Sequence, residues 1–147
     1  MSIKVVTRMG VVAGLALGLT SALPSGAFAS VTAAPAVTVS PSTGLADGAE
    51  VAVVATGLEA DTSYHVGQCA VVDFSTFTLA CNAADSFDVT SDADGNVNTA
   101  ITVRRVYDGV VGAEQEPWGP VDCTVYSCGI GLADSTGAGA GADIAFS

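Results

Sequence analysis

The sequence predicts an all-β fold, an immunoglobulin-like Greek-key β-sandwich of about seven strands, and three observations lead to this prediction. From residue 34 onward, short runs rich in Val, Thr and Ala alternate with turn-forming clusters at intervals of roughly ten residues. No part of this region repeats its apolar residues with the helical period. Four cysteines in an exported chain are typical of a small domain stapled by disulfides.

The first 33 residues resemble an export leader and not part of the domain. Lys4 and Arg8 lie in a segment without acids, and an apolar run follows over residues 11–23. That run is shorter than the ~20 residues needed to cross a bilayer. Cleavage after Ala29 and cleavage after Ala33 both fit the small-residue requirement. We therefore expect a secretory signal peptide over 1–33, one domain over 34–147, an extracellular location and no membrane attachment after leader removal.

The expected domain is strongly acidic. All 15 Asp and Glu residues follow the leader, and only Arg104 and Arg105 oppose them, so the net charge of residues 34–147 is −13. A surface of this charge is repelled by phosphate backbones and by anionic lipid. This charge disfavours direct binding of nucleic acid by the protein, and the self-repulsion favours a monomer.

Alternating patterns and turn signals place the strands in order. Residues 36–40 alternate, and residues 50–56 are rich in Val and Ala before Gly57 ends the run. Residues 93–96 form a hairpin turn, because Asp94-Gly95 tolerates positive φ. The clearest alternation covers residues 97–107 and predicts one continuous strand. The other expected strands are 63–72, 86–91, 121–126, 128–132 and 144–146, with a Gly/Ala-rich turn over 135–141.

The four cysteines fall into two local pairs. Of the three possible connectivities, we expect the one that closes two short loops, Cys69 with Cys81 and Cys123 with Cys128. Loop-closure entropy assigns about 3 kcal/mol to the first bridge and about 2 kcal/mol to the second.

Groups for catalysis and metal binding are sparse. His65 is the one histidine, and its place within a strand predicts a structural or exposed role. One histidine and four disulfide-bonded thiols cannot build a zinc site, and Glu114 and Glu116 read as a solvated loop rim. We therefore expect no metal and no enzyme activity.

Apolar residues are more numerous than a small sandwich core requires. The segments expected as loops hold Phe74, Phe77, Leu79, Tyr107, Val110, Val111 and Trp118. Exposed apolar patches usually mark binding sites, and small-molecule pockets are mostly apolar. Two interpretations remain equally open: these side chains line a hydrophobic cleft, or they fold over and cap the core.

Several segments, in order, resemble the neocarzinostatin family of enediyne antibiotic apoproteins. They are residues 34–41 (APAVTVSP), 43–48 (TGLADG), 64–72 (YHVGQCAVV), 102–105 (TVRR), 117–119 (PWG), 121–123 (VDC) and 144–146 (IAF). The resemblance covers nearly all of residues 34–147 and favours cleavage after Ala33. It implies a seven-stranded sandwich with a side β-ribbon that forms a ligand cleft. The cleft would hold a non-covalently bound enediyne chromophore, which the protein stabilises and delivers and which, once released, cleaves DNA.

The resemblance and the apolar loop residues together give a set of expected ligand contacts, with the Cys69–Cys81 disulfide on the cleft floor. The set is Val71, Phe77, Leu79, Phe87, Val111, Trp118, Gly129 and Ala133. Val71 stands where the family's namesake has a tryptophan, and Gly129 and Ala133 stand where it has polar contacts. The alternative function is a secreted immunoglobulin-like interaction module that has lost its ligand.

Overall fold

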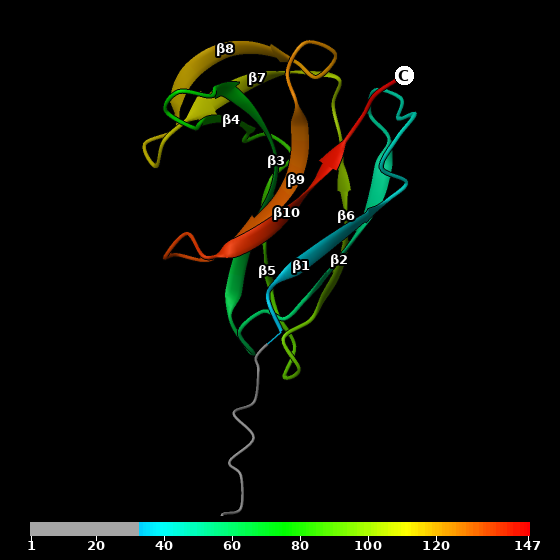
Figure 1. The fold of residues 1–147 in the computed structure, drawn as a ribbon, viewed down its shortest axis with the longest axis vertical. Helices are drawn as coiled ribbons and strands as arrows, with labels where there is room; N and C mark the ends of the chain where they lie inside the picture. Colours follow the sequence, from blue (N-terminus) through cyan, green and yellow to red (C-terminus); the bar gives the residue numbers. More distant parts are fainter. Residues whose placement is uncertain (1–32) are drawn as a thin grey trace, which may run out of the picture. The chain divides into compact units, whose positions relative to one another are not determined.

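The structure is a computed structural model that describes residues 33–147. Within this range all regular secondary structure is β, in two antiparallel sheets (Figure 1), which confirms the predicted all-β sandwich. The strands are β1 (Ala36–Ser40), β2 (Glu50–Thr56), β3 (Ser63–Asp73), β4 (Thr78–Asn82), β5 (Phe87–Thr90), β6 (Val97–Thr102), β7 (Val106–Val111), β8 (Glu116–Asp122), β9 (Cys128–Ala133) and β10 (Gly139–Ile144). The expected leader lies outside the described residues, apart from Ala33. No helix in residues 33–147 is long and apolar enough to cross a bilayer.

The smaller sheet has the order β1-β2-β6. Its central strand β2 alternates strictly, with Val51, Val53 and Ala55 buried and the residues between them exposed. This period of two places one face of the sheet on the core and the other in solvent.

The larger sheet has the order β10-β9-β3-β4-β7-β8, and β5 also pairs with β3. The 11-residue strand β3 organises it, because one of its edges is divided between two partner strands. Its first part, Ser63 to Val66, pairs with β5, and its second part, from Cys69 to Asp73, pairs with β4. The β4-β7-β8 ribbon therefore branches from the sheet at the middle of β3, and in Figure 1 these three strands gather at the top of the domain.

The hydrophobic core lies between the inner faces of the two sheets. Its largest fully buried apolar side chains are Ile101, Ile130, Leu132, Val51, Val53, Val66, Val103 and Val121. Tyr107 is also buried, and its hydroxyl donates a hydrogen bond to the Ala80 carbonyl at 3.0 Å. Burial raises the pKa of this phenol well above its usual range. This hydrogen bond joins β7 to β4 within the ribbon, and the buried Tyr107 ring packs in the core.

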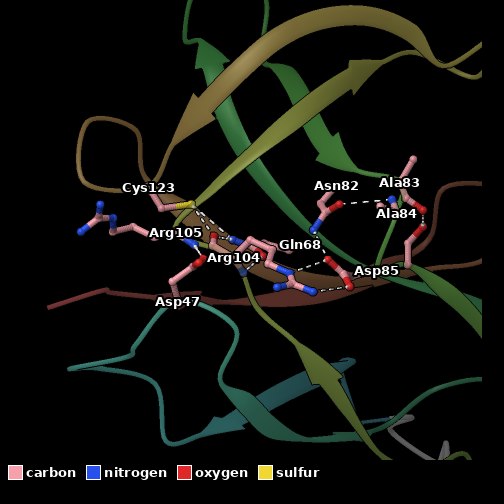
Figure 2. Close-up of polar contacts among 10 residues, drawn as sticks. Asp47, Gln68, Asn82, Ala83, Ala84, Asp85, Arg104, Arg105 and Cys123 are labelled. Atoms are coloured by element: carbon pink, nitrogen blue, oxygen red, sulfur yellow. Dashed lines mark hydrogen bonds and ion pairs between the residues drawn. The ribbon is translucent and has the colours of Figure 1, made fainter.

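One predicted strand is wrong: residues 97–107 form two strands that belong to different sheets. The chain leaves β6 after Thr102 and enters β7 at Val106. The fully buried side chain of Gln68 on β3 explains the break (Figure 2). Its Nε2 donates to the Arg104 carbonyl at 2.7 Å and its Oε1 accepts from the Arg104 amide at 2.8 Å. A side-chain amide thus satisfies both backbone groups that would otherwise pair with a neighbouring strand.

A polar network next to this break holds the β4–β5 connection (Figure 2). The Asp85 carboxylate accepts hydrogen bonds from Arg104 Nε at 3.1 Å and from Asn82 Nδ2 at 2.9 Å. These two contacts, the arginine first, hold the pKa of Asp85 below its usual range. The loop over residues 83–86 is therefore fixed against the segment that links the two sheets.

Other strands also differ from the predictions. The strand β4 and most of β8 lie in segments expected as loops. Residues 123–126 are a turn, because the Asp122 carboxylate accepts from the Thr124 amide at 2.9 Å and the Val125 amide bonds to the Asp122 carbonyl. The last strand is β10, which begins inside the expected Gly/Ala-rich turn and ends at Ile144. Glycines suit this strand because it runs very close to β9: a Cβ on Gly139 would lie 1.8 Å from the Leu132 carbonyl oxygen.

Candidate ligand cleft

The outer face of the large sheet carries the candidate site, and the strand register defines its floor. In an antiparallel pair, residues directly opposite each other point to the same face. Three rows cross the face: Asp88, His65, Ala133 and Gly139; then Gly67, Gly131 and Gly141; then Cys81, Cys69, Gly129 and Asp143. The alternate residues of β3, such as Tyr64, Val66 and Ala70, point into the core.

Two glycines in the middle row of this floor, Gly67 and Gly131, are not required by the fold, whereas a Cβ on Gly141 would lie 3.1 Å from the Ile130 carbonyl oxygen. A Cβ on Gly131 would meet its nearest neighbour at 3.9 Å, and one on Gly67 would meet Ser86 Cβ at 3.5 Å, both ordinary contacts. Neither residue has a positive φ. Glycine within a strand costs about 0.5–1 kcal/mol relative to alanine. Glycine here has one evident effect, which is to keep the floor flat and open.

The wall of the cleft comes from the branching ribbon. Cys69 on β3 and Cys81 on β4 are directly opposite and form a disulfide with their Cα atoms 4.0 Å apart. Leu79, two residues before Cys81, is 49% exposed and borders all three hollows along this face. The second expected disulfide, Cys123–Cys128, also forms, at the base of β9. Both predicted pairings are confirmed.

The hollows have the size and lining of a small-molecule site. The largest of the three has a volume of about 420 Å³ and runs over Gly67, Gly131 and Gly141, within the usual range of ligand pockets. It continues into hollows of about 310 Å³ toward Val110 and Gln115, and of about 230 Å³ toward Val71 and Gly129. A separate hollow of about 490 Å³ is bordered by Ala33 and Ala34. Its shape depends on where the leader is cut, so we assign the site to the glycine-floored cleft.

The polar groups of the cleft do not form a catalytic arrangement. The 420 Å³ hollow has two polar side chains on its lining, His65 and Ser86. The Ser86 hydroxyl donates to the Ala83 carbonyl at 3.1 Å, whereas the His65 ring pairs with Asp88. A serine nucleophile would need the imidazole as its hydrogen-bond partner. Among residues 33–147 there is also no group of three or more His, Cys, Asp or Glu placed to hold a metal ion.

The structure brings together half of the expected contact residues. Val71, Leu79, Gly129 and Ala133 line the hollows described above. The other four lie elsewhere in the domain. Phe77 and Trp118 are 76% and 46% exposed on the ribbon, outside the lining of these hollows. Phe87 and Val111 are half-buried and pack against the core.

Sequence reasoning did not single out His65, Gly67, Ser86, Gly131 or Gly141 as cleft residues, although all five line the 420 Å³ hollow. A signal was present for the glycines. Gly129 and Gly131 alternate along β9, and Gly139 and Gly141 alternate along β10. Glycines at every second position of two paired strands leave one face without side chains.

The fold and the cleft define a small-ligand-binding protein built on a disulfide-stapled β-sandwich. The chain belongs to the neocarzinostatin family, whose sequence model matches residues 37–147, as the resemblance in the sequence indicated.

Similar proteins support this membership. The chain is 45% identical to macromomycin of Streptomyces macromomyceticus over 143 residues. This alignment covers 97% of this chain and 95% of that protein. It is 40% identical over 129 residues to the antitumor antibiotic C-1027 apoprotein of Streptomyces globisporus, covering 88% and 85%. The solved structure of macromomycin matches with a TM-score of 0.74 at 48% identity, over 78% of this chain and 100% of that one. The solution structure of apokedarcidin matches with a TM-score of 0.61 at 39% identity, again over 78% and 100%.

Proposed function

We propose that this protein is a secreted apoprotein that binds, stabilises and delivers a labile, apolar enediyne chromophore without a covalent bond. The observation that carries the proposal is the flat floor of the cleft at Gly67 and Gly131, where a Cβ would fit but is absent, which leaves the surface open for a planar ligand. Membership of the neocarzinostatin family supports it, as does the name of one relative, the apoprotein of an antitumor antibiotic. Family membership also favours a carrier over an interaction module that has lost its ligand.

The cleft suits protection of a reactive molecule better than its conversion. A planar ring on the floor contacts backbone atoms directly, since no Cβ stands between them at Gly67 or Gly131. Each 100 Å² of apolar ligand surface removed from water contributes about 2.5 kcal/mol, offset by the loss of ligand freedom. The same burial keeps water away from the reactive carbons. The protein is therefore a container and not an enzyme.

We assign the ligand contacts to Val71, Leu79, Gly129 and Ala133 together with the disulfide of the floor. Phe77 and Trp118 would contact only a ligand that extends along the ribbon beyond the hollows. Phe87 and Val111 would act indirectly, by supporting the wall from the core side.

The acidic surface fits delivery to DNA by release. Fifteen acids against two arginines in residues 34–147 disfavour direct contact with a phosphate backbone. The chromophore would therefore have to leave the protein before it reaches DNA. The same repulsion favours a monomer.

Binding of a neutral aromatic probe tests the proposal. We expect 4-methoxybiphenyl to shift the amide NMR signals of β3, β9 and β10, and Leu79→Asp to weaken this binding at least tenfold, because a carboxylate would face the apolar wall. Val125→Asp is the matched control: Val125 is 75% exposed and lies on none of the three hollows. The proposal fails if the wild type does not bind the probe, or if both variants bind as the wild type does.

A further inference from the structure

The 420 Å³ hollow has one ionisable side chain on its lining, and the function proposed above does not use it. His65 lies on β3 at the end of the glycine floor, next to Ala133 on β9. Its side chain is 55% exposed, which agrees with the exposed role expected from the sequence. Because the imidazole ring lies at the border of this apolar hollow, a ligand bound in the hollow would contact it.

A neighbouring carboxylate fixes the orientation of this ring. Asp88 on β5 is the direct cross-strand partner of His65, and its Oδ1 lies 2.8 Å from His65 Nδ1. A carboxylate can only accept a hydrogen bond, so Nδ1 carries the proton. In the neutral ring the lone pair then belongs to Nε2. The pair thus leaves Nε2 as a hydrogen-bond acceptor.

The chemistry of the surrounding lining narrows what this acceptor can meet. Because Nε2 of the neutral ring is an acceptor, the ligand group that meets it must be a hydrogen-bond donor. An anionic group would be repelled by Asp88, the charged residue that pairs with His65, and by the net charge of −13. A neutral donor on a planar ring, that is, a phenolic hydroxyl, satisfies Nε2 without burying a charge.

We propose that His65 is the polar anchor of the cleft and that its Nε2 accepts a hydrogen bond from a phenolic hydroxyl of the bound aromatic ligand. Asp88 is a positioning residue that holds the ring in the tautomer this contact needs. The inference rests on the proposed carrier function and adds to it the class of polar group that the ligand presents. A flat floor then selects planar molecules, and His65 selects hydroxylated ones among them.

Two matched probes test the anchor: biphenyl-4-ol and its methyl ether, 4-methoxybiphenyl, which has the same rings but no donor. A net hydrogen bond corresponds to roughly a fivefold difference in affinity, so we expect the wild type to bind biphenyl-4-ol about fivefold more tightly at about pH 8. Because the chain has one histidine, ¹⁵N-histidine labelling gives a single imidazole. Its Nε2 signal should shift when biphenyl-4-ol binds and stay in place with the ether.

Two variants separate anchoring from a structural effect. His65→Phe keeps a flat ring but removes the acceptor, so the ratio of the affinities for the two probes should fall to about one. Asp88→Asn no longer fixes the tautomer and should reduce the preference to about twofold. Both side chains are largely exposed, so the two variants should keep the wild-type amide spectrum in β9 and β10.

The outcomes distinguish the anchor from the carrier function. If the wild type binds both probes equally and the Nε2 signal does not move, the proposal that His65 is the anchor is wrong, while the carrier function stands. If His65→Phe keeps the preference, the hydroxyl is bound elsewhere and the anchor is wrong. If the wild type binds neither probe, the carrier function fails and the anchor fails with it.

Discussion

At the residue scale, the glycines of the cleft floor show that the absence of a side chain can shape a binding surface. Gly131 and Gly129 are neighbours on the same face of β9, yet they are glycines for different reasons. A Cβ on Gly129 would lie 2.9 Å from the Ala142 carbonyl oxygen, so the close approach of β10 demands glycine there. Gly131 has room for a Cβ, so in the proposed carrier its small size would serve the ligand instead of the fold.

Gly131→Ala separates these two roles. We expect an unchanged or slightly higher Tm, because alanine reduces the entropy of the unfolded chain without a clash. We also expect affinity for 4-methoxybiphenyl to fall at least fivefold, because the added methyl group stands on the floor. Thermal unfolding and an NMR titration measure the two quantities. Gly139→Ala is the contrast, since its Cβ would collide with the Leu132 carbonyl, and it should lower the Tm. Full binding by Gly131→Ala would show that the floor is not the site.

Asp85 provides a prediction about acid stability. Its hydrogen bonds to Arg104 and Asn82 hold its pKa below the ordinary value of about 3.9. A carboxyl group whose pKa is lower in the folded state stabilises the protein fully above the unfolded pKa, and this stabilisation is lost as the pH falls through the folded pKa. Asp85→Asn should therefore lower the Tm by a few degrees at pH 7, and the difference should vanish toward about pH 2. Asp108→Asn, at an exposed position of β7, is the control. A difference between Asp85→Asn and the wild type that persists at pH 2 would contradict the assignment.

Individual contacts were most readily predictable where a side chain points out of a strand beside the disulfide. Val71 and Leu79 are direct cross-strand partners next to the Cys69–Cys81 bridge, so the cysteine spacing alone places them near the floor. Phe87 gave no such signal. Its neighbour Asp88 points toward the cleft face, and Phe87 turns inward against the core, a parity that depends on the register of β5 with β3.

At the scale of elements, β3 is the strand on which both the fold and the site depend. It pairs with β9 along one edge and divides the other edge between β5 and β4. The cleft exists because the β4-β7-β8 ribbon branches away at this division. The Cys69–Cys81 bridge ties the ribbon to β3 at that point.

The two disulfides should therefore differ in what they do. Replacing Cys69 and Cys81 by alanine removes a bridge with a sequence separation of 12, which should cost about 3 kcal/mol of unfolding free energy and weaken 4-methoxybiphenyl binding more than tenfold. Replacing Cys123 and Cys128 removes a bridge with a separation of 5, costing about 2 kcal/mol, with binding changed less than twofold. Urea unfolding and NMR titration give the two readouts. Equal losses of affinity in the two variants would mean that the first bridge has no special place in the cleft.

Most strands were predictable from alternation, but β4 and most of β8 were expected as loops, and the change of sheet between β6 and β7 was also missed. The residues from Val97 to Arg105 alternate without interruption, and local pattern therefore indicates one strand. The break at Arg104 is imposed by Gln68, which is 36 residues away in the sequence. A long-range side-chain contact of this kind leaves no mark in the local pattern.

At the scale of the whole molecule, charge, disulfides and cleft form one consistent arrangement. The acidic surface of residues 34–147 favours the solubility of an apolar-rich domain and disfavours contact with nucleic acid. The disulfides stabilise a small core and shape the cleft wall. Each feature suits a carrier protein in which the bound ligand, and not the protein surface, is the reactive component.

The most direct test of this account is to purify the protein in the dark from its native culture and record its near-ultraviolet spectrum before and after organic extraction. We expect absorbance beyond that of the one tryptophan and three tyrosines, which leaves the protein on extraction and appears in the organic phase. Native protein that reproducibly shows the absorbance of these residues alone, and yields an extract without a chromophore, would contradict the account.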